Sequence, residues 1–189
     1  WWLGQGDGFP PGREGTTCVG GAPGWPSGSI RRNGWLWLNP ATNTWTTGAK
    51  ARVPRLYHSI AILLPDARVL TAGSNPSRRN DEMRLEVYHP PYLFRGPRPC
   101  IESAPKKVTL GASFNVHIPG AADIKWLSLV RPMATTHSYD SDQRLVDVPF
   151  RRSGTCHLNA HMPGNPNLVP PGYYMLFAVN RRGVPSIAK

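Results

Sequence analysis

The chain has 189 residues, which suits one large domain or two small ones and is long enough for a hydrophobic core. Apolar residues make up 40% of it, which excludes a disordered tail, and no apolar run approaches the ~18 residues that a membrane-spanning helix needs. Its 19 glycines and 21 prolines argue against long helices and favour short strands joined by turns.

The formal net charge is +11, which suggests an acidic partner such as a nucleic acid, an anionic polysaccharide or an acidic protein surface. The basic residues are spread along the chain, partly as arginine pairs, and no run of five or six occurs. No nucleic-acid-binding motif accompanies them. A solvated basic surface is therefore the simpler interpretation, and a nucleic-acid-binding module would rest on charge alone.

Residues 1–33 are rich in glycine and proline and show neither strand nor helix periodicity, so we expect an irregular segment there. Residues 34–96 carry four short strand-like runs separated by turns, which resemble one blade of a β-propeller. A single blade cannot close a propeller, so the other blades must come from the same parent protein or from another chain. The prolines at positions 90, 91, 97 and 99 predict a stiff linker at the end of this region.

Residues 97–189 carry short strand-like runs at the spacing of a β-sandwich. The clearest alternation places Phe114, Val116 and Ile118 on one face, with His117 facing outward. A run at residues 144–150 contains Pro149, which suits an edge strand. The sequence thus predicts an all-β fold in which a propeller blade precedes a sandwich.

The three cysteines, Cys18, Cys100 and Cys156, form no C-x-x-C pair, which argues against a structural zinc site. Cys100 and Cys156 both lie in strand-like stretches of the second half. A disulfide between them is plausible if the protein is secreted, and the sequence leaves its formation open. Cys18 would then be unpaired or would pair elsewhere.

Several classes of active site are missing from the sequence: it has no glycine-rich phosphate loop, no G-x-S-x-G elbow, no H-E-x-x-H motif and few acidic residues. Among the six histidines, His58 and His137 stand out because each lies in a polar stretch beside an apolar strand. Two imidazoles with a phenol form a nitrogen and oxygen ligand set that suits Cu(II) better than Mg²⁺ or Ca²⁺. Their spacing alone does not specify copper.

Four motifs in a fixed order resemble the galactose oxidase and glyoxal oxidase family, the copper radical oxidases. They are VPRLYHS at 53–59, PPYL at 90–93, THS at 136–138, and PGYYMLF at 171–177 followed by GVPS at 183–186. The resemblance covers about residues 34 to 189. It implies a kelch-type β-propeller followed by an immunoglobulin-like (E-set) sandwich, one loop of which reaches along the propeller axis towards a metal.

The resemblance also implies site residues. His58 and His137 would be the imidazole ligands of copper, and Tyr57 the axial phenolate and the general base that accepts the hydroxyl proton of the substrate. The Tyr57 oxygen and the two histidine ring nitrogens should then converge within about 5 Å of a common point. The family reaction oxidises a primary alcohol or a hydrated aldehyde and reduces O2 to H2O2, and we expect an extracellular or cell-wall location.

One departure from the family concerns its second one-electron acceptor. In the family this acceptor is a tyrosine cross-linked to a cysteine, and both residues lie upstream of the Tyr-His pair. Upstream of Tyr57 this chain has Cys18 but no tyrosine, so the chain alone cannot form that cofactor. The alternative is a non-catalytic, galactose oxidase-like component of a wall, matrix or filament that binds polysaccharide through its basic surface.

Overall fold

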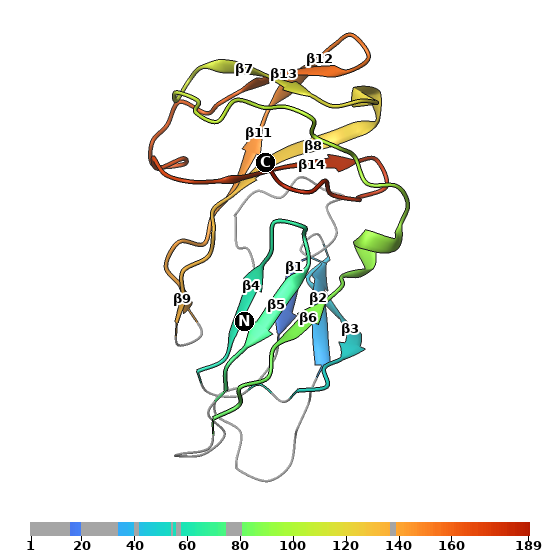
Figure 1. The fold of residues 1–189 in the computed structure, drawn as a ribbon, viewed down its shortest axis with the longest axis vertical. Helices are drawn as coiled ribbons and strands as arrows, with labels where there is room; N and C mark the ends of the chain where they lie inside the picture. The colour runs from blue at the N-terminus through green and yellow to red at the C-terminus, as the bar shows by residue number, and fades with distance from the viewer. Residues whose placement is uncertain are drawn as a thin grey trace. The chain divides into compact units, whose positions relative to one another are not determined.

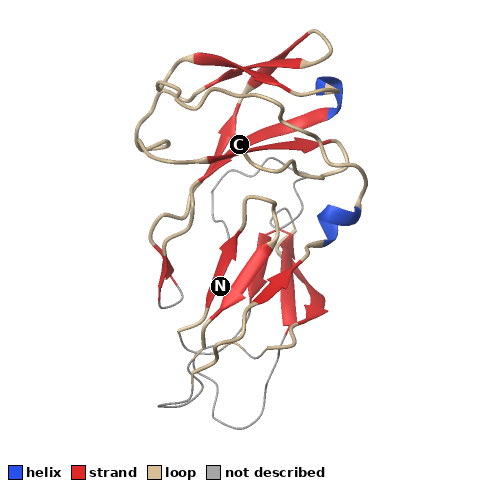
Figure 2. Ribbon diagram, in the orientation of Figure 1, coloured by secondary structure: helices blue, strands red, loops and turns tan. Residues whose placement is uncertain are grey.

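The structure is a computed structural model that describes residues 16–19, 34–39, 42–53, 55, 58–74, 81–136 and 139–189 (Figure 1). Strands dominate the described residues, which contain two short 3-10 helices and no α-helix (Figure 2). The predicted all-β class is confirmed. No helix in the described ranges is long and apolar enough to cross a membrane.

The chain divides into two compact units that do not follow the order of the sequence. The first unit comprises Trp1–Ile62, Leu70–Tyr88 and Met133–Gln143, and the second comprises Leu63–Val69, His89–Pro132 and Arg144–Lys189. The first unit therefore takes in a short segment from the middle of the second half of the chain. That segment forms the small hairpin of β9 (Thr135–Thr136) and β10 (Tyr139–Asp140).

An antiparallel sheet in the first unit contains β1 (Thr16–Val19), β2 (Gly34–Asn39) and β3 (Thr44–Lys50), with β2 in the centre. The turn between β2 and β3 uses Asn43, whose φ of 51° is a left-handed conformation that asparagine tolerates. The prediction that residues 1–33 are irregular throughout is wrong at β1. Its sequence, TTCV, is rich in β-branched residues and pairs along β2 from Thr16↔Leu38 to Val19↔Trp35.

A second three-stranded sheet contains β4 (Ile60–Leu63), β5 (Val69–Ala72) and β6 (Glu86–Tyr88). The turn between β4 and β5 is closed by a hydrogen bond from the Ala67 N–H to the Leu64 carbonyl of 2.8 Å. The five described strands between residues 34 and 88 thus lie in two separate sheets, the first of which also contains β1, and not in one sheet of four. A kelch-type propeller remains a prediction.

The sandwich in the second unit consists of two antiparallel sheets. One has the strand order β11 (Leu145–Val148), β8 (Ile124–Val130), β14 (Met175–Asn180), and the other has the order β12 (Phe150–Ser153), β13 (His157–His161), β7 (Ser113–His117). The 3-10 helix η2 (Ala121–Asp123) precedes β8. The core between the sheets contains the fully buried side chains Val116, Ile118, Ile124, Leu127 and Leu158.

Strand alternation separates the two faces of the β12-β13-β7 sheet. Phe114, Val116 and Ile118 are buried as predicted, and the alternate residues of β7 and β13 face outward. His117 and His157 lie directly opposite each other on that outer face. The prediction that His117 faces away from the core is confirmed.

Pro149 divides the predicted strand at residues 144–150 into two strands. β11 ends at Val148 as an edge strand of one sheet, and β12 begins at Phe150 as an edge strand of the other. Proline has no N–H to donate to a neighbouring strand, so it is tolerated where the chain passes from one sheet edge to the next. Its carbonyl still accepts a hydrogen bond of 2.9 Å from the His161 N–H.

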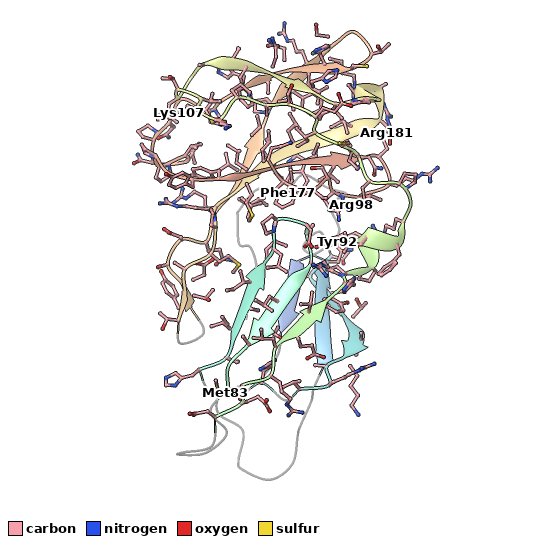
Figure 3. All side chains as sticks on the ribbon, in the orientation of Figure 1. Met83, Tyr92, Arg98, Lys107, Phe177 and Arg181 are labelled. Atoms are coloured by element: carbon pink, nitrogen blue, oxygen red, sulfur yellow. The ribbon has the colours of Figure 1, made fainter. Side chains whose placement is uncertain are left out.

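The proline-rich linker is held in place by side-chain hydrogen bonds. It contains the 3-10 helix η1 (Pro91–Phe94), and the Tyr92 hydroxyl donates to the Ala67 carbonyl at 2.7 Å. Arg98 donates from Nε to the Pro185 carbonyl at 2.9 Å and from Nη2 to the Ser186 carbonyl at 2.7 Å (both linker side chains are labelled in Figure 3). The guanidinium of Arg98 is partly buried, and this burial lowers its pKa.

The disulfide between Cys100 and Cys156, which the sequence left open, does not form in the structure, where both are free thiols. The reason is the strand order. The segment after Cys100 pairs with one edge of β7 through Ser103↔His117, whereas β13, which follows Cys156, pairs with the other edge. β7 thus lies between the residues that follow the two cysteines.

Candidate metal centre

His58 occupies a strained backbone position immediately before β4. Its φ is 60°, in the left-handed region, and its side chain is exposed, whereas the following residue, Ser59, is buried. Such a conformation is uncommon for a residue other than glycine and persists only where its surroundings enforce it. The backbone around His58 therefore sets the direction in which its Cα–Cβ bond points.

Gly73, at the end of β5, lies directly against His58. A Cβ atom on Gly73 would lie 2.7 Å from the His58 carbonyl oxygen, closer than real Cβ contacts. Gly73 itself has a φ of 66°. The close approach and the left-handed backbone both require glycine at this position.

Arg55 holds Gly73 in place from the interior of the same unit. It is 7% exposed, and its guanidinium donates to three backbone carbonyls: Nη1 to Gly73 at 2.7 Å, and Nη2 to Thr71 at 3.1 Å and to Arg84 at 2.7 Å. Burial lowers the pKa of Arg55, while the charges of Glu86 and Glu82 oppose that shift. Arg55 therefore acts on His58 through Gly73, as a positioning residue.

The hairpin of β9 and β10 is stabilised by the carboxylate of Asp140. Its Oδ1 accepts hydrogen bonds from the N–H groups of Ala134 at 2.9 Å and Asp142 at 3.1 Å. Its Oδ2 is buried and has no hydrogen-bond partner in the described part of the chain. His137 and Ser138 connect the two strands, so the hairpin fixes the ends of the segment that carries His137.

Of the three predicted copper ligands, only His58 is among the described residues. Tyr57 and His137 lie outside them, so the convergence of the three donors stays a prediction. The described residues contain no group of three or more His, Cys, Asp or Glu side chains that could hold a metal. The structure adds three residues to which the sequence motifs gave no role, namely Arg55, Gly73 and Asp140.

The described part of the site suits a copper ion, both in the type of donor atom and in the backbone that holds the donor in place. An exposed imidazole on a fixed backbone is a suitable nitrogen ligand, and two imidazoles with a phenol form a set that Cu(II) accepts. The segment that contains His137 also belongs to the same compact unit as His58. His58, His137 and Tyr57 remain the predicted ligands of the ion.

A family model described as galactose oxidase-like, Early set domain, matches residues 98–189. Residues 98–189 are a galactose oxidase-like Early set domain. The predicted resemblance to galactose oxidase is thus confirmed over residues 98–189, and so is the immunoglobulin-like class of the sandwich. The described strands β7, β8 and β11–β14 of the second unit all belong to this Early set domain.

Relatives with known names extend the likeness beyond the Early set domain. "Aldehyde oxidase GLOX" of Vitis pseudoreticulata is 38% identical over 159 residues, which cover 72% of this chain and 29% of the relative. "Galactose oxidase" of Gibberella zeae is 31% identical over 144 residues, which cover 72% of this chain and 21% of the relative. The chain therefore spans less than a third of the length of these relatives.

A solved structure of a fungal alcohol oxidase of the AA5 family, in complex with copper, is also similar. It matches with a TM-score of 0.81 and 30% sequence identity, over 92% of this chain and 39% of the other. The likeness thus includes the Early set domain and most of the residues that precede it.

Proposed function

We propose that the chain is part of a copper radical oxidase that oxidises a primary alcohol or a hydrated aldehyde and reduces O2 to H2O2. The observation that carries the proposal is the set of chain segments that make up the first compact unit. It contains both the segment that ends at Ile62, with Tyr57 and His58, and Met133–Gln143, with His137. The related oxidases and the copper complex of a similar structure support the same reaction class.

The reaction removes two electrons and two protons from the substrate and transfers them to O2, so that RCH2OH and O2 give RCHO and H2O2. A bound copper(II) ion would supply a Lewis acid and a one-electron acceptor. Tyr57 accepts the hydroxyl proton of the substrate at its phenolic oxygen, since a phenol beside a metal has a lowered pKa. His58 and His137 would hold the ion through their ring nitrogens.

The second electron needs an acceptor that this chain does not contain, because no tyrosine precedes Tyr57. In this proposal the cysteine-linked tyrosine and the other propeller blades come from the same parent protein or from another chain. The protein acts outside the cell, where its net charge of +11 would favour contact with anionic polysaccharide of a wall or matrix.

Copper binding by the chain tests the ligand assignment. The chain carrying His157→Ala, which removes the outward-facing histidine pair of the sandwich, is titrated with Cu(II) and followed by electron paramagnetic resonance. We expect one bound ion with nitrogen hyperfine coupling, which His58→Ala and His137→Ala each weaken strongly. Tyr57→Phe should remove any phenolate-to-copper absorption band.

His89→Ala is the matched control, since His89 is also exposed but lies in the second unit, outside the proposed site. The ligand assignment is wrong if neither His58→Ala nor His137→Ala changes copper affinity relative to this control. The copper-loaded chain alone should release no H2O2 from a primary alcohol. Catalytic peroxide release by this chain would contradict the need for an external radical cofactor.

A further inference from the structure

The outer face of the β12-β13-β7 sheet carries two histidines side by side on neighbouring strands. His117 on β7 and His157 on β13 are direct cross-strand partners, with ring centroids 4.6 Å apart and ring planes inclined by 40° (the two strands are adjacent in Figure 1). His157 is exposed and His117 is half-buried. The pair lies in the Early set domain and belongs to the second compact unit, whereas His58 belongs to the first.

Glu102 fixes the orientation of one ring of the pair. Its Oε2 lies 2.8 Å from Nδ1 of His117, so that Nδ1 carries the proton and donates it to the carboxylate. Nε2 of a neutral His117 then keeps its lone pair. A carboxylate that binds the second ring nitrogen is the usual partner of a metal-ligating histidine, because it fixes the tautomer and makes the ring a stronger ligand.

The separation of the rings matches that of two imidazoles on one metal ion. With metal–nitrogen distances of about 2.0–2.1 Å and an angle between about 90° and 109°, the ring centroids lie about 4.5–5.2 Å apart. The observed 4.6 Å lies within that range. The separation of the two rings is therefore compatible with one nitrogen of each ring on a common ion.

We propose that His117 and His157 form a two-imidazole site for a divalent transition-metal ion, with Glu102 as a positioning residue. The described residues hold no group of three or more metal-ligating side chains, so water completes the coordination. Imidazole nitrogens favour the later first-row ions, and the order of affinity is Cu(II) above Zn(II). The site does not depend on the oxidase function proposed for the first unit.

Zinc chloride titration of the chain, followed by the side-chain nuclear magnetic resonance signals of the histidines, tests this site. The titration uses a His58→Ala background, so that failure of the copper centre has no influence on the result. We expect saturable shifts of the His117 and His157 rings, a higher unfolding midpoint with zinc, and a lower Kd for Cu(II) than for Zn(II). His157→Ala should lose these effects, and Glu102→Gln should weaken zinc affinity about 10–100-fold.

His161→Ala is the matched control, because His161 lies on the same face of the same strand but is opposite Ser113. It should leave zinc affinity unchanged. His157 is exposed, so its replacement is not expected to unfold the sandwich, and the metal-free unfolding midpoint of each variant verifies this. The proposal is overturned if zinc affinity is the same with and without His157, or if His161→Ala reduces it equally.

Discussion

The sandwich and the region around His58 are stabilised in different ways. In the sandwich, a continuous cluster of aliphatic and aromatic side chains fills the space between two sheets. Around His58, the buried side chains include polar ones, Arg55, Ser59, Thr71 and Ser74, and directional hydrogen bonds join the segments. Hydrophobic burial stabilises a fold without fixing particular atoms, whereas hydrogen bonds fix particular atoms. Substitutions in the two regions should therefore affect different properties.

The largest effect is expected from a truncation in the core of the sandwich. Leu127 on β8 is 0% exposed, and Leu127→Ala should lower the free energy of unfolding by about 2–5 kcal/mol, since it removes buried methyl groups and leaves a cavity. Urea denaturation followed by tryptophan fluorescence measures the change. Leu85→Ala is the control, because Leu85 is 67% exposed and should shift stability by less than about 0.5 kcal/mol. Equal losses in the two variants would refute the role of this core.

A smaller loss of stability, with a specific effect on His58, is expected from Gly73→Ala. The left-handed backbone costs an alanine about 1–2 kcal/mol, and the new Cβ meets the His58 carbonyl at 2.7 Å. Histidine side-chain resonances should show a displaced His58 ring, and copper affinity should fall. Gly120→Ala separates the two causes, because Gly120 has a φ of 75° but nothing within 4 Å of its Cβ position. If Gly120→Ala perturbed His58 as strongly, the contact between Gly73 and His58 would not be the cause.

The smallest effect concerns the acid titration of Glu82. Hydrogen bonds from the guanidinium and the backbone N–H of Arg84 lower the pKa of Glu82 from 4.5 to about 2. Because the folded-state pKa is the lower one, the ionised carboxylate stabilises the fold above about pH 4.5, and that contribution is lost as the pH falls through about 2. Carboxyl carbon resonances should show Arg84→Met returning the midpoint towards 4.5. An unchanged midpoint would exclude Arg84 as the cause.

The sequence predicted the parts of the fold that depend on local patterns. The alternation of Phe114, Val116 and Ile118 is a period-2 signal that a buried sheet face requires, and it was sufficient to place the core. The strand β1 was missed because four β-branched and small residues between glycines give no such period; its pairing with β2 is a tertiary effect. The sequence left the Cys100–Cys156 disulfide open for the same reason, since the position of β7 between the segments that follow the two cysteines is not a local property.

The candidate site was predictable only in part. The sequence motif around residue 58 predicted a role for His58. The same motif did not show that Arg55, three residues earlier, is buried and donates hydrogen bonds to carbonyls up to 29 positions away along the chain. The role of Gly73 was equally hidden, because it depends on the distance to the His58 carbonyl. Such contacts depend on how distant segments of the chain pack together. No periodic pattern in a single sequence reveals that packing.

The three hydrogen bonds of Arg55 near His58 persist in acid and in mild alkali. Its three acceptors are peptide oxygens, which do not titrate, and a guanidinium stays protonated at physiological pH even when burial lowers its pKa. A lysine there would present one compact ammonium group in place of a planar fork and could not span the same three oxygens. The Gly73 carbonyl, in the segment that lies against His58, should therefore keep its position over a wide range of pH.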